Sequence, residues 1–117
     1  MPTKQQTFDT VVSHLRKQGK RALSDYGKCA YRGRDGTMCA AGCLIPDDKY
    51  ERSFEGASVF GIAYLFTELG HDLALISELQ SIHDGEFPRD WEDHFEDVAL
   101  THGLTYTPPV APPEPAQ

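Results

Sequence analysis

The residues best suited to chemistry gather in one stretch, between Lys28 and Pro46. It contains all three cysteines of the chain, together with a tyrosine, two arginines and an aspartate. A thiolate can act as a nucleophile or bind a metal, and an arginine presents a planar fork of N–H donors that matches phosphate or carboxylate. A second group with chemical potential, the pair His83-Asp84, lies far along the chain. Three kinds of site follow: a binding loop, a cysteine-dependent enzyme and a metal centre.

The binding interpretation depends on four residues, which are Tyr31, Arg32, Arg34 and Asp35. A tyrosine can stack on a base, two arginines can hold a phosphate, and an aspartate can accept hydrogen bonds from a ribose or a base edge. Loops carry function more often than the core does, and these residues surround a predicted turn. The sequence therefore favours a non-enzymatic binding module. Its ligand would be a partner protein or a small, phosphorylated, nucleotide-like molecule.

An enzyme is the first alternative, with Cys39 or Cys43 as the nucleophile and His83 as the base. Nothing in the sequence places His83 near a cysteine, and no cysteine stands in a known nucleophile signature. A structural metal module is the second alternative. On one extended strand Cys39 and Cys43 would lie about 13 Å apart, which zinc, with Zn–S bonds of about 2.3 Å, does not bridge. We therefore expect the three cysteines to be reduced, buried and metal-free, and we expect no cofactor.

The stretch that carries these residues is predicted to be a β-hairpin. Arg34-Asp35-Gly36 suits a bulged turn, because glycine tolerates the left-handed conformation that such a turn needs. In that register Gly33 faces Thr37. The side chains that then share one buried face are those of Cys29, Tyr31, Cys39, Ala41 and Cys43. A two-residue turn on Asp35-Gly36 is the rival register, and it separates Cys29 from the other two cysteines.

Helices are predicted on both sides of the hairpin. Thr3 and Gln6 have the spacing of a capping box, and Gly19 ends the apolar stripe that follows. Apolar periodicity predicts helices over about 3–19, 57–69, 72–85 and 90–103. The expected fold class is α+β, with one small β-hairpin packed among about four α-helices.

Length and composition predict a single globular domain over residues 1–106 and a Pro-rich tail over 107–117. Five of the eleven tail residues are proline, which favours a disordered or polyproline II segment. No apolar run is long enough to span a membrane, and the first residues lack the apolar core of a signal peptide. With an odd number of cysteines, the sequence predicts a cytoplasmic protein without membrane association. The oligomeric state stays open.

The charges are unevenly distributed along the chain, whose net charge is −7. Residues 1–37 carry eight Lys and Arg against three Asp and Glu, whereas residues 38–117 carry three against fifteen. This asymmetry predicts a basic side that includes the hairpin and an acidic side made by the later helices. The overall acidity disfavours non-specific binding of nucleic acid, but it permits a local phosphate site.

Several segments of the chain share a recognisable pattern. They are Phe8 to Gly19, Cys29-Ala-Tyr-Arg-Gly33 with Asp35-Gly36, Cys39-Ala-Ala-Gly-Cys-Leu-Ile-Pro-Asp47, Tyr50, Glu55-Gly56, Leu79-Gln-Ser-Ile-His-Asp84 and Trp91. In these segments the chain resembles a family of small proteins of phages and prophage-bearing bacteria, over roughly residues 5–104. The resemblance implies a phage accessory protein that acts on the host or its defences, with a host or phage protein as a partner. It implies no mechanism.

Overall fold

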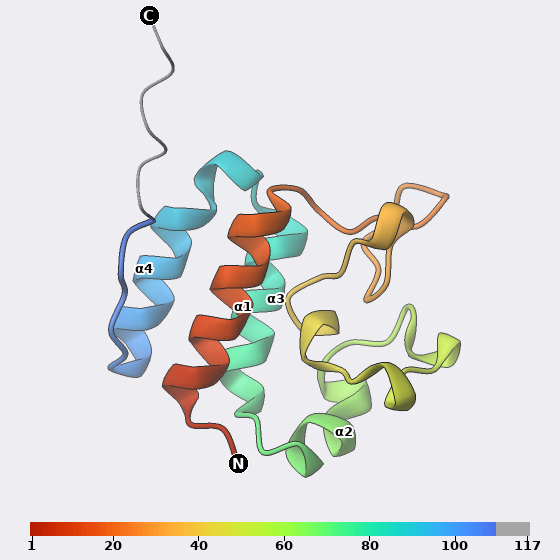
Figure 1. The fold of residues 1–117 in the computed structure, drawn as a ribbon, viewed down its shortest axis with the longest axis horizontal. Helices are drawn as coiled ribbons and strands as arrows, with labels where there is room; N and C mark the ends of the chain where they lie inside the picture. Colours follow the sequence, from red (N-terminus) through yellow and green to blue (C-terminus); the bar gives the residue numbers. More distant parts are fainter. Residues whose placement is uncertain (110–117) are drawn as a thin grey trace, which may run out of the picture.

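Three helices lie side by side on one side of the molecule, and a long irregular segment covers the other side (Figure 1). The computed structural model describes residues 1–109. The α-helices are α1 (Lys4–Gln18), α2 (Ala63–Glu68), α3 (Leu73–Gly85) and α4 (Trp91–His102). Short 3₁₀ turns occur at Arg34–Gly36, Gly42–Leu44, Asp47–Lys49, Arg52–Phe54, Phe60–Ile62 and Pro88–Asp90. None of the helices in this described part is long and apolar enough to cross a membrane.

Helix α1 begins and ends where the sequence predicts. The Thr3 hydroxyl accepts a hydrogen bond from the Gln6 backbone N–H (3.0 Å), and the Gln6 side chain accepts one from the Thr3 N–H (2.8 Å). This capping box satisfies two backbone donors that a helix start otherwise leaves free. At the other end Gly19 takes a left-handed conformation with φ of 67°. The apolar stripe of α1 is buried and consists of Phe8, Val11, Val12 and Leu15.

Helices α3 and α4 are also confirmed. The Asp72 carboxylate accepts from the Leu75 N–H (2.9 Å) and caps α3, whereas the Asp90 side chain makes no capping hydrogen bond to α4. Gly103 ends α4 in a left-handed conformation, and the Leu104 N–H donates to the Ala99 carbonyl (2.8 Å), as in a Schellman motif.

The helix predicted over 57–69 is wrong in its first half. Here the chain makes a 3₁₀ turn at Phe60–Ile62, and α2 begins only at Ala63. Ile62 has φ of −121° and ψ of 33°, which lies outside the helical region and separates the two elements. Gly61, inside the turn, lowers the helical preference of this segment.

The predicted β-hairpin is wrong, and so is the α+β class, because the fold is helical. Between residues 1 and 109 the only β pairing consists of two isolated bridges, Leu23 with Cys29 and Arg32 with Met38. The Gly33 N–H does donate to the Thr37 carbonyl (2.9 Å), so a tight turn forms at Arg34–Gly36. The pairing of the two predicted strands ends after the single bridge between Arg32 and Met38.

Two competing interactions explain why the hairpin stops. The Tyr31 N–H would donate to the Cys39 carbonyl in a longer hairpin, but here it donates to the Glu55 carboxylate (2.9 Å). On the other side the chain turns helically at Gly42–Leu44. Gly42 lies so close to the backbone of Tyr31 that an added Cβ would be 2.1 Å from the Tyr31 carbonyl oxygen.

The loss of the hairpin changes the environment of the cysteines. All three are free thiols, but only Cys39 is buried; Cys43 is half-buried and Cys29 is exposed. The expectation of a shared buried face is therefore wrong for Cys29. Cys29 is exposed as a residue, although its sulfur lies within 4.8 Å of ligand-type atoms of His83 and Asp84.

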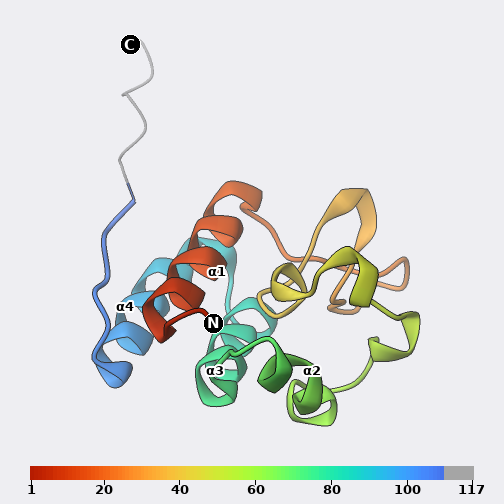
Figure 2. The same ribbon diagram turned by 60° about the horizontal axis from the view of Figure 1, so that its bottom comes forward.

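The core lies between the three long helices and the irregular segment, which packs on the side of α1 and α3 away from α4 (Figure 2). After α4 the chain continues as an irregular segment that includes half-buried Leu104 and Tyr106, both packed against the core. Of the predicted tail, residues 107–109 are exposed and non-helical, and residues 110–117 lie outside the described residues.

Candidate functional site

Two adjoining hollows open in the surface near residue 29. The first, here called the basic cleft, has a volume of about 570 Å³ and is lined by Tyr26, Lys28, Arg32, Arg34, Tyr50 and Arg52, among others. The second, here called the polar cleft, has a volume of about 360 Å³ and is lined by residues that include Tyr31, Phe60, Ser77, Gln80, Ser81 and Asp84. The residues common to both linings are Cys29, Ala30, Glu55 and Gly56. The clefts therefore meet at residue 29.

Glu55 holds together the segments that form the walls of both clefts. Its carboxylate accepts hydrogen bonds from the backbone N–H groups of Tyr31 (2.9 Å) and Arg32 (3.1 Å) and from the Tyr50 hydroxyl (2.5 Å). Backbone donors that a β-ladder would have satisfied are thus satisfied by a side chain. Glu55 thereby fixes the 24–34 segment against the 50–60 segment without a sheet.

Tyr31 and Arg32, two of the predicted site residues, are largely engaged within the fold. Tyr31 is buried, its hydroxyl donates to the Ala57 carbonyl (2.6 Å), and burial raises its pKa well above the usual range. The Arg32 guanidinium donates to the Asp47 carboxylate (2.8 Å) and the Ile45 carbonyl (2.7 Å), and lies 4.8 Å from the centre of the Tyr50 ring. Tyr31 therefore forms a wall and does not stack on a ligand, while Arg32 braces the basic cleft.

Arg34 and Asp35, the other two predicted residues, lie on the surface and are separated in function. Both are exposed, and only Arg34 lines the basic cleft; both line a different hollow beside Lys20 and Arg21. Asp35 has φ of 59° and serves the tight turn. Sequence reasoning missed Lys28 and Arg52, because no spacing rule links these residues to Arg34 before the chain is folded.

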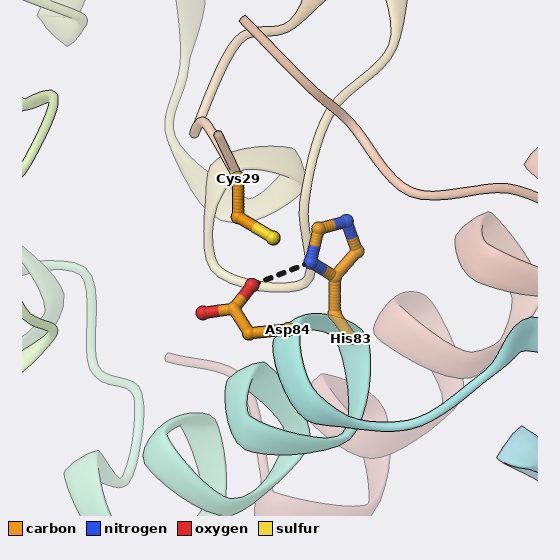
Figure 3. Close-up of side chains that lie close together, drawn as sticks. All are labelled: Cys29, His83 and Asp84. Carbon is orange, nitrogen blue, oxygen red and sulfur yellow. Dashed lines mark hydrogen bonds and ion pairs between the residues drawn. The ribbon is translucent and has the colours of Figure 1, made fainter. Parts of the chain in front are cut away.

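The third feature is a cluster formed by Cys29, His83 and Asp84, whose ligand-type atoms all lie within 4.8 Å of one another (Figure 3). His83 is fully buried and its ring stacks on Trp91, with the ring centres 5.9 Å apart. Its Nδ1 lies 2.7 Å from an Asp84 carboxylate oxygen. Its Nε2 accepts a hydrogen bond from the Ala22 backbone N–H (2.9 Å).

The hydrogen bond from Ala22 decides the protonation of the His83 ring. A backbone N–H can only donate, so Nε2 carries no proton and the neutral ring bears its proton on Nδ1, where Asp84 accepts it. Both ring nitrogens are therefore occupied. A metal bound at Nδ1 would move the proton to Nε2, where it would point at another donor. This arrangement opposes both a metal ion and a general-base role at His83.

The cysteines are not prepared for nucleophilic attack either. Burial, with a further contribution from the Asp84 charge, raises the pKa of Cys29 to about 11. Burial raises the pKa of Cys39 and of Cys43 to about 12. Catalytic thiols need the opposite shift, toward the thiolate. The pKa shifts therefore do not favour the alternative of Cys39 or Cys43 acting with His83.

Comparison of the chain with protein-family models, with curated proteins and with solved structures finds no match. The resemblance to phage proteins stays a prediction from the sequence.

Proposed function

We propose that the protein is a binding module that holds a small phosphorylated ligand in the basic cleft. The observation that carries this proposal is a set of three cations without partners. Lys28, Arg34 and Arg52 line the cleft, and the side chains of all three lack ion pairs and hydrogen bonds with the described residues 1–109. Unpaired arginines that converge on a cavity suit a phosphate, whose oxygens accept from the guanidinium fork.

The acidic residues in the lining do not cancel these charges. Asp25 and Glu55 are the carboxylates in the basic cleft, and Glu55 already accepts three hydrogen bonds from the protein. Together with Arg32 the cleft holds four cations against two carboxylates, in a chain whose net charge is −7. A local positive field in an acidic protein attracts an anion to this place and to few others.

The backbone under the cations is held in position, which favours binding. The Arg34 N–H donates to the Leu23 carbonyl (2.9 Å), and the Arg34 carbonyl accepts from the N–H (3.1 Å) and the hydroxyl (2.6 Å) of Thr37. Arg52 begins a 3₁₀ turn that leads directly to Glu55. Ordering of the binding loops is therefore largely complete before a ligand arrives, and this lowers the entropic cost of binding. The volume of about 570 Å³ also falls within the range of small-molecule sites, roughly 300–1,000 Å³.

We also propose a biological role and a cellular location for the protein. The role of a phage accessory protein that acts on the host or its defences is supported by the sequence resemblance alone. A cytoplasmic location is supported by the three free thiols, which persist in reducing compartments.

The experiment is a titration with inorganic pyrophosphate, followed by backbone amide chemical shifts in NMR spectra. We expect saturable shifts at residues 26–34 and 52–56, and we expect the double substitution R34A/R52A to weaken binding at least tenfold. Lys17, an exposed cation on α1 that lines neither cleft, gives the matched control K17A, which should bind as the unchanged protein does. Shifts confined to other surfaces, or binding that ignores R34A/R52A, would refute the proposal.

A further inference from the structure

We infer that the phosphorylated ligand is a nucleotide, with its phosphate in the basic cleft and its sugar and base in the adjoining polar cleft. This inference rests on the proposed function, because it needs the phosphate end to be held by Lys28, Arg34 and Arg52. What it adds is the identity of the rest of the ligand. The groups that line the polar cleft indicate this identity.

The two clefts adjoin, because four residues line both of them, and the inference requires one molecule to reach from one cleft into the other. Of the residues common to their linings, Ala30 has a small side chain and Gly56 has none. Open space surrounds Gly56, where an added Cβ would meet no atom within 4 Å. Large side chains therefore do not separate the clefts at these two positions, whereas Cys29 and Glu55 are the other residues that line both. The two volumes, about 570 and 360 Å³, give room for a charged end and an uncharged end.

The polar cleft carries negative charge, whereas the basic cleft carries positive charge. This difference determines which end of the ligand enters which cleft. Asp84 is the carboxylate that α3 contributes to it. Burial opposes ionisation of this group, but the hydrogen bonds from His83 and Gln80 prevail and lower the pKa of Asp84 below its usual range. A carboxylate that stays ionised repels a phosphate and accepts hydrogen bonds from hydroxyl groups. The cleft therefore suits the hydroxyl-bearing, uncharged part of the ligand.

The hydrogen-bonding groups of α3 match a sugar. One Asp84 oxygen, Oδ1, accepts from His83 and Gln80, and the other oxygen points away from the imidazole (Figure 3). Within the described residues the Ser77 hydroxyl has no hydrogen-bond partner, while the Ser81 hydroxyl donates to the Ser77 carbonyl and can still accept. A free carboxylate oxygen and two hydroxyls on one helix can bind adjacent hydroxyl groups, such as those of a ribose.

Phe60 provides the surface for the base. It lines the polar cleft, yet 61% of its area is exposed, although most large apolar side chains of this protein are buried. It belongs to the 3₁₀ turn at Phe60–Ile62 and lines the same cleft as Ser77 and Ser81 of α3. An exposed aromatic ring beside sugar-binding groups is suited to stacking on a nucleobase, and loss of such a ring typically weakens binding by about tenfold or more.

The test compares three probes by calorimetric titration: inorganic phosphate, ribose 5-phosphate and the nucleoside 5′-monophosphates one at a time. We expect affinity to rise along this series, with at least a tenfold gain from ribose 5-phosphate to the best nucleotide. F60A should remove that last gain and leave ribose 5-phosphate binding unchanged. S77A should reduce the gain from phosphate to ribose 5-phosphate. The control Y64A removes an equally exposed ring that lines neither cleft, and it should leave all three affinities unchanged.

The outcomes separate this inference from the proposed function. Equal affinity for the three probes, with R34A/R52A still abolishing binding, would overturn the nucleotide and keep the phosphate site. A nucleotide preference that neither F60A nor S77A alters would overturn the assignment of the polar cleft. If none of the probes binds, both proposals fail.

Discussion

His83 is held at both ring nitrogens, and this determines what the residue can do. The Ala22 N–H donates to Nε2, Nδ1 donates to Asp84, and the ring stacks on Trp91 in the core. A histidine with these contacts joins α3 to the segment that follows α1. The same contacts place the ring next to Cys29.

Replacement of His83 should therefore affect stability. We expect H83A to lower the free energy of unfolding by about 2–4 kcal/mol, because it leaves a cavity beside Trp91 and a buried Ala22 N–H without an acceptor. Urea unfolding followed by circular dichroism measures this change. His94 also faces a carboxylate, that of Glu86 at 3.2 Å, but is 39% exposed. H94A is the control and should cost less than about 1 kcal/mol.

The reactivity of Cys29 can contradict this structural role of His83. With a pKa near 11, its thiolate fraction near neutral pH is roughly a hundredfold below that of an ordinary cysteine. Alkylation by iodoacetamide should therefore be slower in the folded protein than in urea, despite the exposure of the residue. Faster alkylation in the folded state, lost in H83A, would show that His83 activates the thiol after all.

At the scale of elements, the sequence predicted the parts whose signals are local. The boundaries of α1, α3 and α4 depend on capping residues and apolar stripes a few positions apart, and such contacts form within the element itself. The hairpin failed because its outcome depends on distant segments. Glu55 takes the hydrogen bond that the Tyr31 N–H would give to Cys39, and Gly42 packs against the Tyr31 carbonyl.

The same difference between local signals and distant contacts applies to the candidate site. Arg32 and Arg34 were expected together and do line one cleft, because both flank a single turn. Arg52 and Lys28 join them only through the packing of the 50–60 segment on the 24–34 segment. The polar cleft depends on α3 lying beside residue 29, and no pattern in the sequence connects these positions.

Gly42 is the element-scale position that we expect to be least tolerant of substitution. G42A should destabilise the fold by about 2–3 kcal/mol or more, because the added Cβ would lie 2.1 Å from the Tyr31 carbonyl oxygen and backbone would have to move. The effect is measured as a lower urea midpoint. Gly85, at the end of α3, has no atom within 4 Å of an added Cβ and has an ordinary φ. G85A is the matched control and should change stability by no more than about 0.5 kcal/mol. Equal effects of the two substitutions would mean that the close approach at Gly42 is absent.

On the scale of the whole molecule, part of the basic character of the first 37 residues is used to hold the chain together. The Arg16 guanidinium pairs with Glu92 of α4 through two hydrogen bonds of 2.9 and 2.7 Å. The Arg21 guanidinium donates to the carbonyls of His83 (3.2 Å) and Glu86 (2.7 Å). Arg16 and Arg21 therefore attach the end of α1 and the residues after it to α4 and to the end of α3. Of the cations in the first 37 residues, Lys28 and Arg34 line the basic cleft without a partner among the described residues.

The segment after α4 completes this assembly, as it runs back beside that helix (Figure 1). The Gln5 side chain pairs with both backbone groups of Thr105, accepting at 2.8 Å and donating at 3.0 Å. The Tyr106 hydroxyl donates to Glu92 (2.7 Å), and Arg16 donates to the Thr107 carbonyl (2.8 Å). Residues 104–107 thus join the first turn of α1 to its last turn and to α4.

Two truncations distinguish this segment from the Pro-rich residues that follow it. A chain that ends at Thr107 keeps all of these contacts, and its Tm should fall by no more than about 2 °C, since a Pro-rich segment with a single side chain larger than alanine or proline among its apolar residues buries little apolar surface. A chain that ends at Gly103 loses Leu104 and Tyr106 from the core surface and the hydrogen bonds of Gln5 and Arg16. A loss of about 2–3 kcal/mol corresponds to a fall in Tm on the order of 10 °C. Differential scanning calorimetry of the two chains beside the full chain measures both changes. Similar Tm values for all three would show that the segment does not stabilise the helices, and a large fall already at Thr107 would assign that role to residues 108–117.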